Sequence, residues 1–303
     1  MNAASNLRGA LFMMGSMVAF TLNDACVKLL AEDVPLFQIV FLRGLLTTAL
    51  MVVTVAAFGR LSFRIPKGDR GKVALRTFFE VAAMVAFLTA LVNMAIANAT
   101  AILSALPLLV TLAAALLFRE PLGWRRLTAV GVGFTGVLMI VQPGTEGFNV
   151  YSLVALVAVL LITGREMTTR AFSPEVPSMT VAVITAASVC VFGGVASLFE
   201  PWVALGWREV GLIAIASVFI IGGYVFSVMV MRVGEVGFTA PFRYTALVFA
   251  LVLGLVLFDE LPNTLALSGA AVVMGTGIYT LLRERALRRA AAARATVKGS
   301  AHG

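Results

Sequence analysis

Long segments of almost uninterrupted apolar residues constrain this chain more than any other feature of its sequence. The segment 238–260 reads FTAPFRYTALVFALVLGLVLFDE, and a helix of roughly 20 apolar residues is enough to cross the hydrocarbon core of a bilayer. The composition agrees, because 60% of the residues are hydrophobic and only 13% are charged, a balance far from that of soluble globular proteins. The chain is therefore expected to be an integral membrane protein.

Apolar segments of this length follow one another along all 303 residues, with no polar block long enough for a separate soluble domain. The sequence therefore predicts an all-α integral membrane protein with ten transmembrane helices. The predicted spans are 8–30, 36–58, 73–93, 97–118, 124–141, 150–169, 177–199, 209–231, 237–258 and 264–282.

Two of these spans end in the same way, which indicates an internal repeat. The segment 101–120, AILSALPLLVTLAAALLFRE, ends with Phe118 and Glu120. The segment 238–260 ends in the same way, with Phe258 and Glu260. Because five spans per half is an odd number, the second half must enter the membrane from the opposite face. We expect two inverted five-helix repeats around a central cavity, at 1–148 and 149–283, followed by a basic tail at 284–303. The tail is expected to be a frayed, solvated extension, with a helix lying on anionic lipid as the alternative.

Lysine and arginine gather in the connections at one end of the predicted bundle, whereas the connections at the other end are mainly acidic. The basic connections are 60–76, which includes Arg76, 119–126 and the tail, and Arg208 is the clear basic residue at the acidic end. Positively charged connections stay on the cytoplasmic side. We therefore expect both termini in the cytoplasm of a bacterium and the spans in its inner membrane. The net charge of +8 follows from this topology, and no basic patch with interleaved aromatic residues indicates nucleic-acid binding.

The residues needed for catalysis or for cofactor binding are not found inside the spans. The single histidine, His302, lies in the tail, and Asp24 has no second intramembrane aspartate as a companion. Cys26 and Cys190 lie within apolar spans, as small buried residues do. The G-x-G-x-x-G pattern at 131–136 follows no strand and lies inside a predicted span, so it does not indicate a dinucleotide site. We expect no enzyme activity, cofactor or metal.

Six charged residues stand out inside the predicted spans, where a charge costs about 2.5–3.5 kcal/mol to insert. Counting along the spans places two of them in the outer third of the membrane and four in the inner third. The outer pair is Asp24 and Arg43, and the inner set is Glu80, Arg165, Glu166 and Arg243. Each set has a net charge of zero, so ion pairs that hold helices together remain an alternative to a solute site. Carboxylates at this depth can also bind coupling protons.

Arg243 favours the functional interpretation of the inner set. It follows Pro241, which interrupts helical hydrogen bonding, and precedes Tyr244, whose ring and hydroxyl suit an amphipathic organic solute. Tyr224 joins the candidates because it follows Gly222 and Gly223 in the middle of a span. The predicted substrate-binding residues are Asp24, Arg43, Glu80, Arg165, Glu166, Tyr224, Arg243 and Tyr244.

These blocks give the whole chain a resemblance to a known family. The segments 98–107 and 118–120, together with their counterpart 238–260, resemble the ten-span, EamA-type drug/metabolite transporter superfamily. The resemblance implies two inverted five-helix repeats around a central cavity, alternating access and cytoplasmic termini.

A closer likeness is to the bacterial S-adenosylmethionine uptake carriers of that superfamily. It rests on Asn23 and Asp24 with Lys28, on 41–43 (Phe-Leu-Arg) and on 240–244 (Ala-Pro-Phe-Arg-Tyr). The resemblance implies a secondary transporter of a small amphipathic or zwitterionic metabolite, either S-adenosylmethionine-like or amino-acid-like. The alternatives are an exporter of amino acids or drugs and a non-transporting membrane receptor or scaffold, and the oligomeric state stays open.

Overall fold

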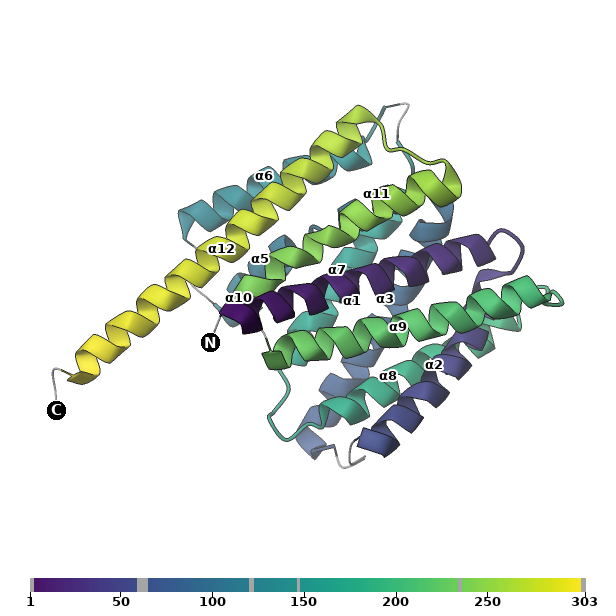
Figure 1. Cartoon of the computed structure of the whole chain (residues 1–303), viewed down its shortest axis with the longest axis horizontal. Helices are drawn as coiled ribbons and strands as arrows, with labels where there is room; N and C mark the ends of the chain where they lie inside the picture. Colours follow the sequence, from purple (N-terminus) through teal and green to yellow (C-terminus); the bar gives the residue numbers. More distant parts are fainter. Residues whose placement is uncertain (1–2, 59–64, 120–122, 146–147, 234–235, 301–303) are drawn as a thin grey trace.

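The computed structural model describes residues 3–58, 65–119, 123–145, 148–233 and 236–300. Across these ranges the chain forms a bundle of helices (Figure 1). Nine of the described helical stretches are long and apolar enough to cross a membrane, and a shorter apolar helix covers Leu127–Val141. The prediction of an all-α, multi-pass membrane protein is confirmed. The main helices are α1 (Ala3–Leu30), α2 (Leu36–Phe58), α3 (Arg70–Asn93), α4 (Ile96–Leu103), α5 (Leu106–Phe118), α6 (Trp124–Val141), α7 (Tyr151–Arg170), α8 (Ser178–Ser197), α9 (Trp207–Val233), α11 (Thr245–Phe258) and α12 (Thr264–Ser300).

Two predicted spans, 97–118 and 237–258, are not single helices. The first consists of α4 and α5, separated by Ser104 and Ala105. The second begins with the short helix α10 (Val236–Thr239), continues as the 3₁₀ helix η2 (Ala240–Tyr244), and becomes α11 only afterwards. Both breaks occur next to a proline in the first turn of the following segment. Proline has no backbone N–H to donate, so a helix readily restarts at that position.

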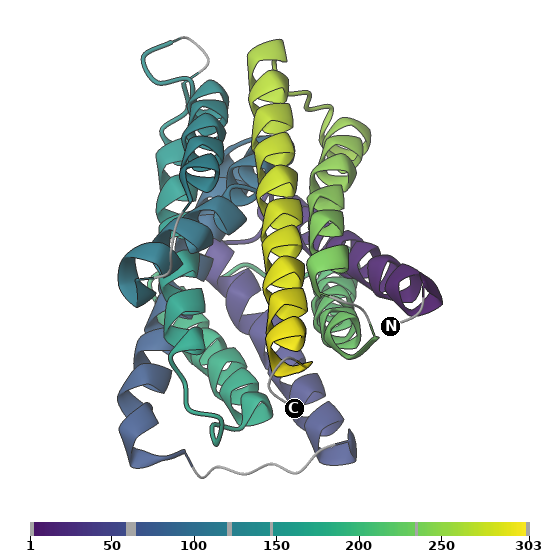
Figure 2. The ribbon, with the colours of Figure 1, turned by 90° about the vertical axis from the view of Figure 1, so that its left-hand side faces the viewer.

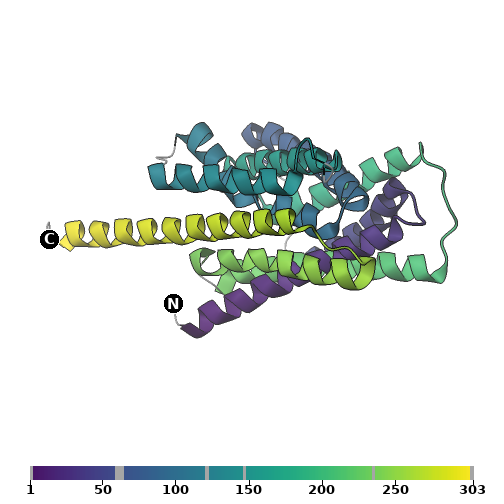
Figure 3. The same ribbon diagram turned by 90° about the horizontal axis from the view of Figure 1, so that it is seen from above.

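The described part of the tail continues the last helix. The backbone of α12 stays helical as far as Ser300 and projects well beyond the bundle (Figures 1 and 3). Alanine and arginine are both strong helix formers, and they dominate this part of the sequence.

Helices from the two halves pair in a regular order. The most extensive contacts join α1 with α9, α2 with α8, α3 with α7, and α6 with α12, while α4 packs on α11. The first helix of one half thus meets the third of the other, and the second, fourth and fifth each meet their own counterpart. A pseudo-twofold axis between two inverted repeats produces this order. Figure 2 shows α12, the last helix of this order, crossing the front of the bundle.

The two ends of the bundle can be defined by contacts between helices. At the acidic end, the ends of α1, α3 and α11 meet through hydrogen bonds of Lys28 with Met94 and Glu260. At the basic end, the start of α3 meets the end of α7, where Lys72 donates to the carbonyl of Ala171. Figure 3 shows both chain termini at the same end of the bundle.

A continuous apolar core lies between the helices, and large apolar side chains also cover the outside. Ile39, Ile96 and Ile102 are completely buried, whereas Leu117 and Val256 are about two-thirds exposed on the helix surfaces. An outer surface of this kind is suited to lipid rather than to water.

Candidate functional site

Asp24 and Arg43 come together between α1 and α2, with an asparagine between them. Arg43 is buried, and its Nη1 donates to Oδ1 of Asn23 at 2.8 Å. Nδ2 of Asn23 donates in turn to Oδ1 of Asp24 at 3.0 Å. No ion pair to Asp24 occurs among the described residues. We call Asn23, Asp24 and Arg43 the Asp24 group. The sequence predicted the two charges in this group but not the amide that links them.

An aromatic pair lies one helical turn from Asp24. Phe20 precedes Asp24 by four residues, so both side chains lie on the same face of α1. The ring of Phe20 packs edge-to-face against Tyr224 of α9, with centroids 5.4 Å apart. Gly223 permits this contact, since a Cβ at that position would lie 2.6 Å from the ring of Phe20. The sequence singles out Tyr224 because two glycines precede it. In the structure, Gly223 allows α1 and α9 to approach closely at this point.

Tyr224 connects the Asp24 group electrostatically with charges on α3 and α7. It lies within electrostatic reach of Glu80, Arg165 and Arg43. Its side chain is nevertheless 43% exposed. Tyr224 is therefore both close to the intramembrane charges and partly accessible.

Glu80, Arg165 and Glu166 form the ion-pair network that their common depth predicts. Nη1 of Arg165 lies 3.0 Å from Oε1 of Glu80, and its Nη2 lies 2.7 Å from Oε1 of Glu166. Arg76, one turn before Glu80 on α3, adds a guanidinium 3.5 Å from Oε2 of Glu80. We call these four residues the Glu80 network. The sequence places Arg76 in the basic connection, because α3 begins with several polar residues. The length of the arginine side chain nevertheless lets its guanidinium reach Glu80, one turn further along the helix.

Arg76 also ties the network to a third helix. Its Nε donates to Thr169 of α7 at 3.0 Å and its Nη1 donates to Thr185 of α8 at 2.6 Å. The network therefore holds α3, α7 and α8 together near the basic end.

The structure does not bring Arg243 into this network. Arg243 lies on η2 with an exposed side chain and forms no ion pair with another described residue. Tyr244 is buried, and its hydroxyl has no hydrogen-bond partner in the described part of the chain. Its phenol packs against Gly277 of α12, where a Cβ would collide with it. Arg76 supplies the second positive charge that the sequence had assigned to Arg243.

Equivalent contacts close the ends of α5 and α11. At the acidic end, Nζ of Lys28 lies 5.0 Å from the ring centroid of Phe258 and 2.8 Å from Oε1 of Glu260. At the basic end, Cζ of Arg170 lies 5.1 Å from the ring centroid of Phe118. Glu120, the sequence counterpart of Glu260, lies outside the described residues.

The backbone repeats the same device at both helix ends. Arg119 follows α5 with a φ of 53°, and Asp259 follows α11 with a φ of 52°, a left-handed conformation that is uncommon for residues other than glycine. The described residues of the two endings, 118–119 and 258–259, thus share one backbone arrangement. A cleft of about 860 Å³ lies beside the acidic-end contact, lined in part by Lys28, Asn93 and Glu260.

Among the described residues, no group of three or more histidine, cysteine, aspartate or glutamate side chains could hold a metal ion. The intramembrane polar side chains form two sets, the Asp24 group with the Phe20–Tyr224 pair one turn away and the Glu80 network of ion pairs.

Comparisons with known proteins agree with a transporter. Residues 7–142 match the family model described as the EamA-like transporter family. The chain is 22% identical over 282 residues to the S-adenosylmethionine uptake transporter of Rickettsia prowazekii (strain Madrid E), which covers 92% of this chain and 94% of that protein. It is 23% identical over 272 residues to the pseudopaline exporter of Pseudomonas aeruginosa, covering 88% and 93% of the two chains. A solved crystal structure is similar in fold, with a TM-score of 0.66 at 20% identity over 92% of this chain and 99% of that one.

Proposed function

From the premise that this multi-pass membrane protein carries an EamA-like transporter domain, we propose that it is a secondary transporter of a small amphipathic or zwitterionic metabolite. The solute is S-adenosylmethionine-like or amino-acid-like, and alternating access moves it across a bacterial inner membrane with both termini in the cytoplasm. The protein is a carrier with no enzyme activity and no cofactor.

The observation that carries this proposal is an intramembrane carboxylate beside an accessible aromatic pair. Asp24 has no ion-pair partner in the described part of the chain, and one helical turn away Phe20 packs on the exposed Tyr224. A carboxylate within a membrane span is costly without a countercharge. A positively charged solute supplies that charge, and aromatic rings bind both cations and planar ring systems.

Arg43 provides the complementary charge for a zwitterion. Its guanidinium donates to Asn23 through Nη1 and lies within electrostatic reach of both Asp24 and Tyr224. A guanidinium pairs well with a carboxylate, because its donors match the spacing of the two carboxylate oxygens. An α-amino acid group therefore carries an ammonium suited to Asp24 and a carboxylate suited to Arg43.

The remaining candidates support the transport cycle rather than the first contact with the solute. Glu80, Arg165 and Glu166 hold α3 and α7 together. Arg243 and Tyr244 lie on the interrupted helix η2, and an interruption inside a span is typical of transporter binding sites. The pseudo-twofold order of the helices and the matched contacts at the two ends support alternating access.

The relatives favour the same class of solute and include both transport directions. S-adenosylmethionine, which the Rickettsia relative takes up according to its name, combines a sulfonium cation, an adenine ring and an amino-acid group. These three parts correspond to Asp24, to the Phe20–Tyr224 pair and to the opposite charges of Asp24 and Arg43. Because another relative is named as an exporter, export of a zwitterion through the same site is the second candidate function.

The experiment is thermal unfolding of the detergent-purified protein with S-adenosylmethionine, amino acids, riboflavin and nucleosides. A solute that binds the folded state raises the midpoint by mass action. We expect a shift with S-adenosylmethionine or an amino acid that is lost in Asp24→Asn and kept in Asp33→Asn, a change at the exposed acidic end.

Transport in proteoliposomes then separates a carrier from a receptor. A solute that stabilises the protein must also exchange across the membrane. Binding without exchange would contradict the proposed function and favour a receptor or scaffold. Binding that survives Asp24→Asn would contradict the site.

A further inference from the structure

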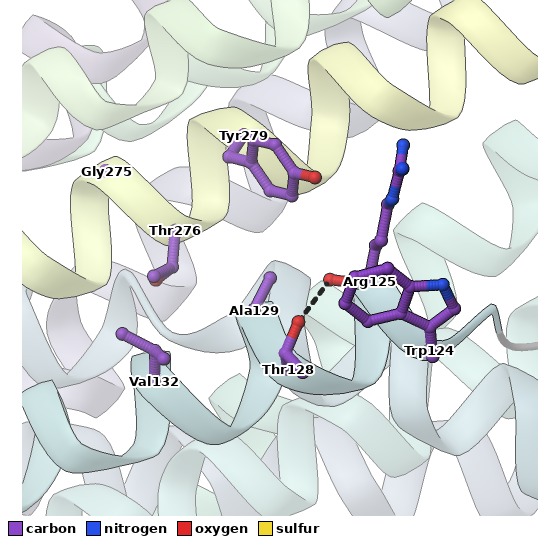
Figure 4. Close-up of a pocket in the computed structure, with 8 residues that line it drawn as sticks. All are labelled: Trp124, Arg125, Thr128, Ala129, Val132, Gly275, Thr276 and Tyr279. Carbon is purple, nitrogen blue, oxygen red and sulfur yellow. Dashed lines mark hydrogen bonds between the residues drawn. The ribbon is translucent and has the colours of Figure 1, made fainter.

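A groove of about 330 Å³ runs between α6 and α12 on the outside of the bundle, apart from the Asp24 group and the Glu80 network (Figure 4). On α6 it is lined by Arg125, Thr128 and Val132, which are three and four residues apart and so share one helix face. On α12 it is lined by Thr276 and Tyr279, and Arg283 follows one turn later on the same face. The groove therefore follows the two helices toward the basic end.

The inner part of the groove is apolar. The hydroxyl of Thr128 donates to the carbonyl of Arg125 at 3.0 Å, and that of Thr276 donates to the carbonyl of Val272 at 2.8 Å. Both hydroxyl protons are thus used within their own helices. Gly275 leaves the floor open, since nothing lies within 4 Å of the position that a Cβ would occupy there. In a membrane span, an open apolar groove of this kind accommodates an acyl chain.

The mouth of the groove is cationic and aromatic. Trp124 is 71% exposed and Tyr279 is 45% exposed, and tryptophan and tyrosine favour the headgroup level of a bilayer. The guanidinium of Arg125 lies over the ring of Trp124, 5.3 Å from its centroid. No carboxylate lines the groove, and Arg125 forms no ion pair with another described residue. Unpaired arginines at this level attract anionic headgroups.

We propose that this groove binds one anionic phospholipid. Its phosphate lies between Arg125 and Arg283, and one acyl chain lies along Val132 and Gly275. A second copy of the chain is a poorer occupant, because a symmetric dimer through this face would bring two identical cationic mouths together. The lipid site does not depend on the identity of the transported solute.

The experiment titrates the detergent-purified protein with phosphatidylglycerol or with phosphatidylcholine of identical acyl chains, and follows the unfolding midpoint. We expect about tenfold tighter binding of phosphatidylglycerol. Arg125→Gln removes this preference because it removes the charge. Its control, Arg208→Gln, changes an exposed arginine at the acidic end and keeps the preference.

Filling the groove tests the acyl chain separately. Gly275→Leu occupies the open floor and weakens binding of both lipids, whereas Gly211→Leu, at an α9 glycine where a Cβ also meets nothing within 4 Å, leaves both unchanged. Val132→Phe fills the groove from α6 and serves if Gly275→Leu folds poorly. Equal affinity for the two lipids, or unchanged binding in both filling variants, overturns the proposal. A dimer in light scattering that Gly275→Leu converts to a monomer assigns the groove to a second copy and also overturns it.

Discussion

In the Glu80 network each guanidinium lies within 3.5 Å of a carboxylate, whereas in the Asp24 group a neutral amide separates the two charges. Both sets have a net charge of zero and both lie inside membrane spans. In the first set the charges of α3 and α7 neutralise one another directly. In the second set, Asn23 takes up one guanidinium nitrogen and one carboxylate oxygen, and no ion pair forms.

The difference separates a structural role from a binding role. Charges that are already paired offer little to a solute, because binding would first have to break an existing ion pair. A carboxylate and a guanidinium held apart by an amide are oriented but not neutralised. The geometry therefore favours the Asp24 group as the place where a charged solute binds and the Glu80 network as a brace between helices.

The largest expected effect is on the brace. Glu80→Ala removes the carboxylate that both Arg76 and Arg165 contact. It leaves two largely buried guanidinium groups with too little negative charge, and we expect a loss of about 3 kcal/mol in the free energy of unfolding. Thermal unfolding in detergent measures this loss, with Glu32→Ala at an exposed position as the control. Equal midpoints for the two variants would contradict a structural role of the network.

A somewhat smaller loss is expected at the acidic end, next to the Asp24 group on α1. Nζ of Lys28 is buried and donates to the carbonyl of Met94 at 2.6 Å and to Glu260 at 2.8 Å. Lys28→Met leaves both acceptors without this donor, but Glu260 is partly exposed and gains water, so we expect a loss of about 2 kcal/mol.

Arg208→Met is the matched control for Lys28→Met. The Arg208 side chain is 57% exposed and pairs with Asp33, which is 58% exposed, and such a surface pair contributes less than about 1 kcal/mol. If both variants lower the unfolding midpoint equally, the buried contact of Lys28 with Met94 and Glu260 stabilises the protein no more than an exposed ion pair does. In that case the contact does not anchor α1 at the acidic end.

The sequence predicted the charges and their depth, but it could not show which of them pair. Apolar length located α2 and α6, and repeated endings located the matched contacts at Phe118 and Phe258. Which charged residues form ion pairs depends on the length of their side chains and on how each helix is rotated about its axis. The length of a span gives neither. For this reason Arg76 takes the place in the network that the sequence predicts for Arg243, which lies on η2.

The third prediction concerns the unpaired carboxylate. Asp24→Asn removes a charge that has no ion-pair partner among the described residues, so we expect the unfolding midpoint to stay the same or to rise, because an unpaired charge inside a span is costly. Solute affinity falls at least about tenfold, because a charge-assisted contact is lost. Uptake into proteoliposomes and thermal unfolding of the same preparation measure the two effects. A variant as unstable as Glu80→Ala, with normal transport by the protein that remains folded, would reverse the roles assigned to the two sets.

The smallest effect on stability is expected at Arg243. Its side chain is exposed and unpaired within the described residues, so Arg243→Ala changes the free energy of unfolding by no more than about 0.5 kcal/mol. A guanidinium at a helix break inside a span nevertheless needs water or a negatively charged partner, since facing lipid would be costly. A solute carboxylate is such a partner, and transport should therefore fall in Arg243→Ala and recover in Arg243→Lys, which keeps the charge. Unchanged uptake and efflux in Arg243→Ala would remove Arg243 from the site and leave the Asp24 group as the sole charged contact with the solute.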